Sequence, residues 1–283
     1  MPKIKSPLRY PGGKSRAVKY LYQFIPNYQE FREPFFGGGS MTFFCQQKKS
    51  HAHYIANDLN YELYCFWTMV KSDVGQLVNE ILHIKKTWTN GRQLFQTILA
   101  RRHDDLSILQ RAVDFFVLNR ITFSGVVDSG GYSEQSFQKR FTLSSIERLK
   151  MAHKIVKNML FTSNDYKELL ICNGQDIFIF LDPPYYSATK SRLYGKKGNL
   201  HVGFNHKRLH KYLKSCSHHW LMTYDNSLYI QDLYSDFYQL SWELQYGMNN
   251  YKKTFAAKGK ELLISNYPLA HNKNKQFMLF KKA

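Results

Sequence analysis

Short apolar runs alternate with polar stretches along much of the chain, and several of these runs predict β-strands. The clearest is Asp-Ile-Phe-Ile-Phe-Leu at 176–181, which is too short for a typical helix and is rich in β-branched and aromatic residues. Runs of this kind predict strands at 31–35, 53–57, 159–164, 176–182 and 219–224, with a late pair near 238–246 and 261–267. Their order along the chain indicates an α/β fold.

The pattern changes between 70 and 150, where apolar residues recur at helical spacing. This spacing predicts helices over 74–84, 91–100 and 107–119. A turn or hairpin tip is predicted at 126–133, followed by a helix start in which Ser144 and Glu147 form a capping box. We therefore predict that a mainly helical insert, residues 70–154, interrupts an α/β domain made of residues 1–69 and 155–283.

Asp182-Pro183-Pro184-Tyr185 carries the most informative chemistry. These residues follow the apolar run directly, and neither proline has a backbone N–H with which to continue a sheet. The segment therefore predicts a rigid turn at the carboxyl end of a strand, where α/β sheets bind ligands. A carboxylate, a proline carbonyl and a flat ring suit a heterocycle that carries an amino group. Taken alone, the four residues fit a strand-terminating turn with a surface aspartate equally well.

A glycine-rich turn precedes this segment. Glu33-Pro34-Phe35-Phe36-Gly37-Gly38-Gly39 joins a short strand to helical residues, and such a turn lets the backbone come close to a ligand. Asp58 follows the next strand about 20 residues later, a position suited to binding two ribose hydroxyls. Taken alone, tight-turn geometry explains the glycines, and a helix N-cap explains Asp58. Their joint occurrence in this order favours a cofactor site.

This ordered set resembles the Dam-type DNA adenine-N6 methyltransferases, the class whose cofactor motifs precede the target-recognition region. The resemblance spans nearly the whole chain. It rests on Tyr10 to Lys14, Glu33 to Ser40, Asn57 to Asn60, Leu118 to Arg120 with Phe123 to Gly125, Asn164 to Tyr166, Leu181 to Tyr185, and Lys258 to Tyr267. It implies a Rossmann-like, seven-stranded methyltransferase sheet, with residues 70–154 as the target-recognition domain.

The resemblance also implies a reaction and a cofactor. S-adenosylmethionine would supply a methyl group to adenine N6 in duplex DNA, and its sulfonium is a good leaving group, so no metal is expected. Asp182 and the carbonyl of Pro183 would accept the two N6 protons, and Tyr185 would stack on a flipped-out base. The implied cofactor residues are Tyr10, Lys14, Phe35, Gly37, Gly39, Asp58, Asp165, Tyr166 and Asp182. For Tyr10 and Tyr166, ordinary packing remains the alternative.

The insert and a later loop supply the expected DNA contacts. The residues expected to contact DNA are Arg120, Phe123, Ser129, Tyr132, Gln135, Gln138, Lys139, Arg140, Lys196 and Lys197. The glycine-flanked tip from Asp128 to Ser133 would enter a groove. Lys190 to His206, polar and basic, is predicted to be a mobile loop beside the active site. Phe123 sits where GATC-reading relatives carry an aromatic wedge. Ser124 replaces their Asn, and no arginine follows until Arg140, so GATC specificity is not carried over.

Composition fits a nucleic-acid partner. Lys and Arg number 40 against 21 Asp and Glu, a formal net charge of +19, and such an excess favours a polyanion because it releases counterions from phosphate. A generally basic surface is the alternative. Aromatic residues reach 16%, and stacking on bases is one use for them. No run approaches about 18 apolar residues, and the N-terminus lacks a signal-peptide pattern.

We therefore expect a cytoplasmic protein, associated with the nucleoid through DNA, that is monomeric or dimeric. The four cysteines, Cys45, Cys65, Cys172 and Cys216, are widely spaced and predicted to be reduced thiols. Two other classes stay open: a methyltransferase acting on RNA or on a protein glutamine, and a DNA-binding module that has lost catalysis. An Asp at position 182 and the insert argue against the first, and the intact motifs argue against the second. The recognition sequence, and whether a restriction enzyme accompanies the protein, are not predicted.

Overall fold

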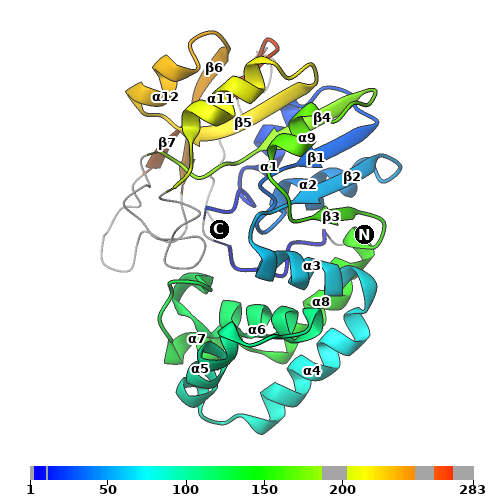
Figure 1. Cartoon of the computed structure of the whole chain (residues 1–283), viewed down its shortest axis with the longest axis vertical. Helices are drawn as coiled ribbons and strands as arrows, with labels where there is room; N and C mark the ends of the chain where they lie inside the picture. Colours follow the sequence, from blue (N-terminus) through cyan, green and yellow to red (C-terminus); the bar gives the residue numbers. More distant parts are fainter. Residues whose placement is uncertain (1–2, 11, 187–202, 246–257, 270–283) are drawn as a thin grey trace.

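A seven-stranded sheet forms the centre of the computed structural model, which describes residues 3–10, 12–186, 203–245 and 258–269 (Figure 1). The strand order is β3-β2-β1-β4-β5-β7-β6. The strands are β1 (Glu30–Glu33), β2 (His53–Asn57), β3 (Leu160–Thr162), β4 (Ile177–Leu181), β5 (His219–Asp225), β6 (Tyr238–Gln245) and β7 (Lys258–Ser265). Pairs from β3 to β5 are parallel, and β7 is antiparallel to both β5 and β6. The predicted α/β, Rossmann-like sheet is confirmed.

Strand β4 shows why its sequence is a continuous apolar run. All five of its residues are buried, because both faces of the sheet are covered. Phe178 and Phe180 pack into one hydrophobic cluster, while Ile177, Ile179 and Leu181 pack into the other. This division follows the two-residue period of a strand. The centre of the sheet is therefore covered by apolar side chains on both faces.

Different helices cover the two faces of the sheet. Leu170, Leu209 and Ile230 bring α9 (Lys167–Ile171), α11 (His206–Lys214) and α12 (Leu228–Leu233) against the face of Ile179. The other face is covered by α1 (Val18–Leu21) with the 3₁₀ turn η1 (Tyr22–Phe24), α2 (Ser40–Gln46) and α3 (Tyr61–Ser72). Together they give the three-layer arrangement of an α/β domain.

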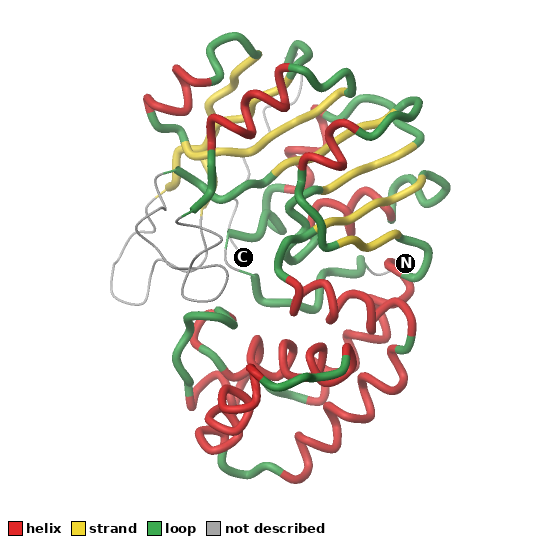
Figure 2. Tube along the Cα trace, in the orientation of Figure 1, coloured by secondary structure: helices red, strands yellow, loops and turns green. Residues whose placement is uncertain are grey.

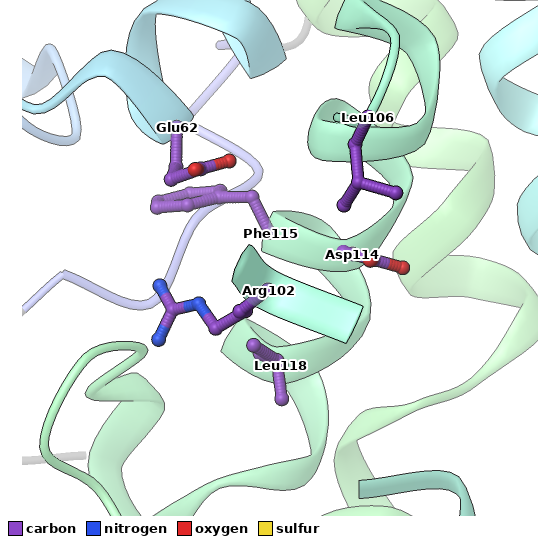
Figure 3. Close-up of a pocket in the computed structure, with 6 residues that line it drawn as sticks. All are labelled: Glu62, Arg102, Leu106, Asp114, Phe115 and Leu118. Carbon is purple, nitrogen blue, oxygen red and sulfur yellow. The ribbon is translucent and has the colours of Figure 1, made fainter. Parts of the chain in front are cut away.

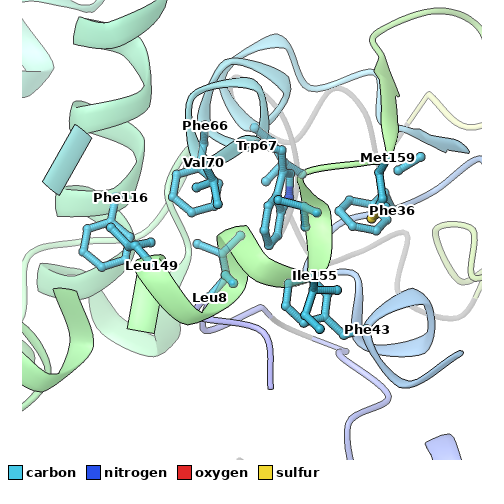
Figure 4. Close-up of a cluster of buried hydrophobic side chains, with 14 of the residues drawn as sticks. Leu8, Phe36, Phe43, Phe66, Trp67, Val70, Phe116, Leu149, Ile155 and Met159 are labelled. Atoms are coloured by element: carbon cyan, nitrogen blue, oxygen red, sulfur yellow. The ribbon is translucent and has the colours of Figure 1, made fainter. Parts of the chain in front are cut away.

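Trp67 of α3 is a central contact of that second face (Figure 4). Its ring lies 5.2 Å from Phe36 and 5.7 Å from Phe43, measured between ring centroids. Its indole N–H donates to the carbonyl of Gly37 at 3.0 Å. The hydrophobic core therefore fixes the backbone of the glycine-rich turn.

The predicted helices of the insert are confirmed, and they pack on one another beside the sheet (Figures 1 and 2). They are α4 (Val74–Thr87), α5 (Gly91–Ala100), α6 (Ile108–Ile121), α7 (Glu134–Arg140) and α8 (Leu143–Val156), with 3₁₀ turns η2 (Arg101–His103) and η3 (Phe123–Gly125). Phe66 of α3 stacks on Phe116 of α6, and Leu149 of α8 joins the same cluster. The core is thus continuous from the sheet into these helices.

One local prediction in this part of the chain needs correction. Helix α8 starts earlier than predicted: Thr142 is its N-cap and shares a capping box with Ser145, so the Ser144–Glu147 box is wrong. Thr142 has the extended backbone that an N-cap requires, whereas Ser144 already lies in the helix.

The turn predicted at 126–133 is present: an isolated antiparallel bridge between Thr122 and Tyr132 closes the loop, with backbone bonds from Phe123 to Gly131 and from Ser133 to Ile121. Val126 and Val127 at its start are buried. Most of the predicted 190–206 loop lies outside the described residues.

Candidate active site

The candidate site lies at the carboxyl edge of the parallel strands. The glycine turn follows β1, Asp58 follows β2 and Asp182 follows β4. Since β2, β1 and β4 are neighbours in the sheet and parallel, their ends converge at one edge. Ligands bind in α/β sheets at this edge.

The glycine turn is shaped for close contact with a ligand. Gly37 and Gly39 have φ angles of 48° and 64°, in the left-handed region that favours glycine. A Cβ atom on Gly37 would lie 2.6 Å from the Tyr10 ring, so this ring covers the turn directly. A Cβ atom on Gly39 would clash with the Phe36 ring, so the turn is bare backbone with two aromatic rings against it.

Asp58 ties the ends of β1 and β2 together. Its carboxylate accepts from the amide of Gly37 at 2.8 Å and from the amide of Asn60 at 3.0 Å. Burial raises the pKa of Asp58 to about 6, and the Asp128 carboxylate adds to the rise. Asn60, not Asp58, caps helix α3, because its side chain accepts from the amides of Glu62 and Leu63. The helix-cap interpretation of Asp58 is therefore wrong.

Glu33 holds the helix that follows the glycine turn. It is buried and accepts from both the amide and the hydroxyl of Thr42 in α2. Burial raises the pKa of Glu33 to about 8, although the two Thr42 contacts oppose the rise. The sequence motif contained Glu33 without indicating this positioning contact.

Three aromatic rings gather beside this edge. Phe35 lies 5.3 Å from Tyr166 and 5.6 Å from Phe204, and Tyr166 lies 5.9 Å from Phe204, between ring centroids. Asp165 pairs with Arg208 at 2.8 Å, and the Arg208 guanidinium lies over the Tyr166 ring. Phe204 was missed by sequence reasoning, because a single Phe before α11 carries no distinguishing pattern.

Asp182 is held by two donors. The Lys14 ammonium lies 2.8 Å from Oδ1 and 3.0 Å from Oδ2, and the Thr223 hydroxyl donates to Oδ1 at 2.7 Å. Lys14 and Thr223 are buried, while 21% of the Asp182 side chain is exposed. Sequence reasoning missed Thr223. Leu181 of β4 pairs with Met222 of β5, and this register places Thr223 next to Asp182.

The neighbourhood of Tyr185 completes the site. Its ring stacks on Tyr224 at 5.8 Å between centroids, and the Lys14 ammonium lies 4.8 Å from its centre. Burial, with Asp182 and Glu261 nearby, raises the pKa of Tyr185 well above its ordinary value. Pro183 is buried beside it. The structure thus brings together Lys14, Asp182, Pro183 and Tyr185.

Asn119 connects the N-terminal segment to the helical part. Its side chain accepts from the amide of Arg9 at 3.0 Å and donates to the carbonyls of Arg9 and Gly125 at 2.8 and 2.9 Å. Ser124 and Gly125 have positive φ angles in the turn that follows. Phe123, which begins this turn, is 70% exposed. The turn therefore presents an aromatic side chain to solvent.

Arg120 does not lie on that surface. Only 3% of it is exposed, and its guanidinium donates to the carbonyl of Pro7 and to Asn119. Burial lowers the pKa of Arg120 to about 9, and Arg9, Arg148 and Arg140 lower it further. The expectation that Arg120 contacts DNA is therefore corrected: in this structure its side chain is buried and hydrogen-bonds within the protein.

The other expected DNA contacts lie in several settings. Exposed residues are Ser129, Gln135, Gln138, Lys139 and Arg140, the last four on α7. Tyr132 is half-buried and donates to Glu134, which also accepts from Gln138 at 2.9 Å. Asp128, at the expected tip, pairs with Arg102 and accepts from Asn60. Lys196 and Lys197 lie outside the described residues.

A small pocket among the helices is not a nucleotide site (Figure 3). It is lined by Glu62, Arg102, Leu106, Asp114, Phe115 and Leu118. Its polar side chains are already paired, Glu62 with Arg111 and Asp114 with Arg101. Its volume of about 10 Å³ is near that of a single water site.

The described part of the chain has neither a metal-binding cluster nor a membrane-spanning helix. No group of three or more His, Cys, Asp or Glu side chains there is arranged to hold a metal. No helix there is long and apolar enough to cross a membrane. The four cysteines are free, with Cys45 and Cys65 buried.

Residues 10–248 match the family profile described as D12 class N6 adenine-specific DNA methyltransferase. The chain belongs to this family. The match begins at Tyr10 and includes both the sheet-edge motifs and the helical insert. The D12-class assignment confirms the resemblance seen in the sequence and makes the protein an adenine-specific DNA methyltransferase.

Named relatives agree with the D12-class assignment. M.MjaIII, a type II methyltransferase of Methanocaldococcus jannaschii, is 23% identical over 206 residues, which cover 66% of this chain and 71% of that protein. The type II methyltransferase M1.LlaDCHI of Lactococcus lactis subsp. cremoris is 23% identical over 280 residues, covering 92% and 94%. A DNA adenine methylase of Vibrio cholerae is 22% identical over 188 residues, covering 65% and 66%.

Proposed function

We propose that this D12-class enzyme transfers the methyl group of S-adenosylmethionine to N6 of an adenine turned out of duplex DNA. Asp182, Pro183 and Tyr185 would form the base site. The observation that carries this proposal lies at the end of β4, where the buried Lys14 and Thr223 hold the carboxylate of Asp182. It fixes a carboxylate beside a proline carbonyl and an aromatic ring, the set that an exocyclic amino group needs.

The residues of the sheet edge fit S-adenosylmethionine. Gly37 and Gly39 keep bare backbone, because a Cβ atom would clash with the Tyr10 ring at Gly37 and with the Phe36 ring at Gly39. Asp58 lies at the end of β2 with carboxylate lone pairs suited to ribose hydroxyls. The rings of Phe35, Tyr166 and Phe204 form an aromatic group suited to an adenine ring. Asp165 precedes Tyr166 in the chain and lies beside this group. When bound, this cofactor supplies a methyl group already activated by the sulfonium.

Asp182 would orient the amino group of the target. One carboxylate oxygen would accept an N6–H bond and the carbonyl of Pro183 would accept the other, which favours a pyramidal nitrogen with a localised lone pair. The hydroxyl of Thr223 holds Asp182 Oδ1 at 2.7 Å, so the carboxylate plane is set before the base arrives. Tyr185, packed on Tyr224, would stack on the flipped base.

DNA recognition is assigned to residues 70–154, the proposed target-recognition domain. Phe123 projects from a left-handed turn and is 70% exposed, which suits a wedge between base pairs. The exposed residues of α7, Gln135, Gln138, Lys139 and Arg140, have the donors and acceptors that base edges require. The net charge of +19 would attract the phosphate backbone.

A methyl-transfer assay with three substrate classes tests the proposal. The protein and S-adenosylmethionine with a labelled methyl group are mixed with duplex DNA, structured RNA or a protein carrying glutamine, and the products are hydrolysed and separated by mass spectrometry. We expect label in N6-methyladenine from duplex DNA. Label confined to RNA or glutamine would contradict the proposal and favour a methyltransferase of that substrate class. Cofactor binding without any transfer would contradict it and favour a DNA-binding module that has lost catalysis.

A further inference from the structure

We propose that Glu261 is a positioning residue for methyl transfer, which takes over the Lys14 ammonium when the target adenine reaches Asp182. The inference rests on the proposed function, in which Asp182 accepts a hydrogen bond from adenine N6. Glu261 lies on β7, within the segment 258–267 that contributes to the family resemblance, but the resemblance assigned it no role.

Lys14 lies between two carboxylates in a buried setting. Its ammonium contacts Asp182 at 2.8 and 3.0 Å, and one oxygen of Glu261 is 4.0 Å away. The side chains of Lys14 and Glu261 are only 3% and 1% exposed. The carbonyl of Gly12 accepts from the same ammonium at 3.1 Å. Lys14 is thus bonded mainly to Asp182, and the Glu261 carboxylate lies just beyond hydrogen-bond distance.

The proposed chemistry favours a movement of Lys14. In this structure Lys14 donates to both oxygens of Asp182, and Thr223 also donates to Oδ1. Three of the roughly four acceptor positions of this carboxylate are therefore filled, and an ammonium that stays on both oxygens competes with the N6–H bond for the carboxylate. A buried ammonium that loses its partner is costly, so it needs a replacement. A shift of roughly 1 Å would bring Lys14 from 4.0 Å to hydrogen-bond distance of Glu261.

The surroundings of Glu261 make this exchange sensitive to pH. Lys14, Asp182, Tyr185 and Asp225 face it from the N-terminal segment, the turn after β4 and the paired strand β5. Burial raises the pKa of Glu261 to about 7. Lys14 and Tyr185 oppose this rise, whereas Asp182 and Asp225 add to it.

The direction of the pH effect follows from that raised pKa. Above about pH 7 Glu261 is charged and can receive Lys14. Below that value Glu261 is protonated and neutral, so Lys14 stays on Asp182 and competes with adenine N6 for the carboxylate. The single-turnover rate of methyl transfer should therefore fall on the acid side of about pH 7.

The test compares Glu261→Gln with the wild type and with Glu243→Gln, a matched control on the neighbouring strand β6 at an exposed position. Single-turnover methyl transfer to duplex DNA is measured from about pH 5.5 to pH 9, together with calorimetric affinity for S-adenosylmethionine and thermal unfolding. Wild type and the control should share an acid limb near pH 7. Glu261→Gln should lose that limb and be at least about tenfold slower at pH 8, with unchanged cofactor affinity.

Two further variants keep the test decisive if Glu261→Gln unfolds. Glu261→Asp retains a carboxylate and should retain the acid limb at a reduced rate. Lys14→Gln should abolish the limb, because no ammonium remains to be exchanged. An acid limb that persists unchanged in Lys14→Gln or Glu261→Gln would overturn the role of Glu261 while leaving the proposed function intact. Absence of DNA methylation by the wild type would instead overturn the proposed function.

Discussion

The backbone amide of Gly37 donates a 2.8 Å hydrogen bond to the carboxylate of Asp58. This bond joins the turn after β1 to the end of β2, and the Trp67 indole holds the carbonyl of the same glycine at 3.0 Å. The backbone proposed to contact the cofactor and the carboxylate proposed to bind its ribose are therefore built as one unit. A change at either residue should disturb the binding of S-adenosylmethionine.

Asp58→Ala should weaken the binding of S-adenosylmethionine by about 1.5–3 kcal/mol, the scale of a hydrogen bond to a charged group. The expected loss has two sources: the ribose contact and the bond that shapes the Gly37 turn. Isothermal calorimetry measures it directly. The control is Asp105→Ala, at an exposed position in the helical part, which should leave affinity unchanged. Equal affinity for Asp58→Ala and wild type would show that Asp58 has only a structural role.

Gly37→Ala should both destabilise the fold and impair cofactor binding. The new Cβ would lie 2.6 Å from the Tyr10 ring, and the φ of 48° is strained for alanine. We expect a loss of about 1–3 kcal/mol in the free energy of unfolding, measured by denaturant titration. Gly131→Ala is the matched control, because a Cβ there meets nothing within 4 Å. Similar stability of the two variants would mean that the glycine turn is not constrained as described.

Phe123→Ala should reduce the extrusion of the target base without changing the stability of the protein. The ring is 70% exposed, so its removal leaves no cavity in the core. Fluorescence of 2-aminopurine placed at the target position reports base extrusion, and thermal unfolding reports stability. The exposed Leu143→Ala is a control for loss of a surface apolar group. Unaltered fluorescence in Phe123→Ala would remove Phe123 from the DNA interface.

Arg140→Ala and Gln138→Ala should each lower the discrimination between cognate and mismatched DNA sites. Both residues are exposed on α7, and a lost base contact typically costs about 1–3 kcal/mol of discrimination. Replacing Lys196 and Lys197 together should instead weaken binding to every sequence and reduce its salt dependence. Competition binding at several salt concentrations separates the two effects. Unchanged mismatch penalties in both α7 variants would place sequence readout elsewhere.

The sequence predicted those parts of the site that are local in the chain. Asp58 and Asp182 were predicted at strand ends because each directly follows an apolar run. Thr223 and Glu261 could not be predicted, since they approach Asp182 only through the pairing of β4 with β5 and β5 with β7. No motif marks Thr223, and the segment 258–267 of the family resemblance gave Glu261 no role.

Arg120 was predicted to contact DNA, but its side chain is buried. A basic residue in a basic insert suggested a DNA contact, but its partner is the carbonyl of Pro7, which is distant in sequence. Local composition cannot reveal a contact of that kind. The seven-stranded sheet was easier to predict, because its strands follow apolar runs and the family resemblance implied a seven-stranded methyltransferase sheet.

Asp182→Ala tests the central claim most directly, by comparing methyl transfer with cofactor binding in the same variant. Duplex DNA and methyl-labelled S-adenosylmethionine give the single-turnover rate, and calorimetry gives the cofactor affinity. We predict a rate lower by about 10²–10⁴-fold, the contribution of one positioned acid–base group, with cofactor affinity within about threefold of wild type. A rate within about tenfold of wild type would contradict the assignment of Asp182 as the residue that binds and orients the adenine amino group.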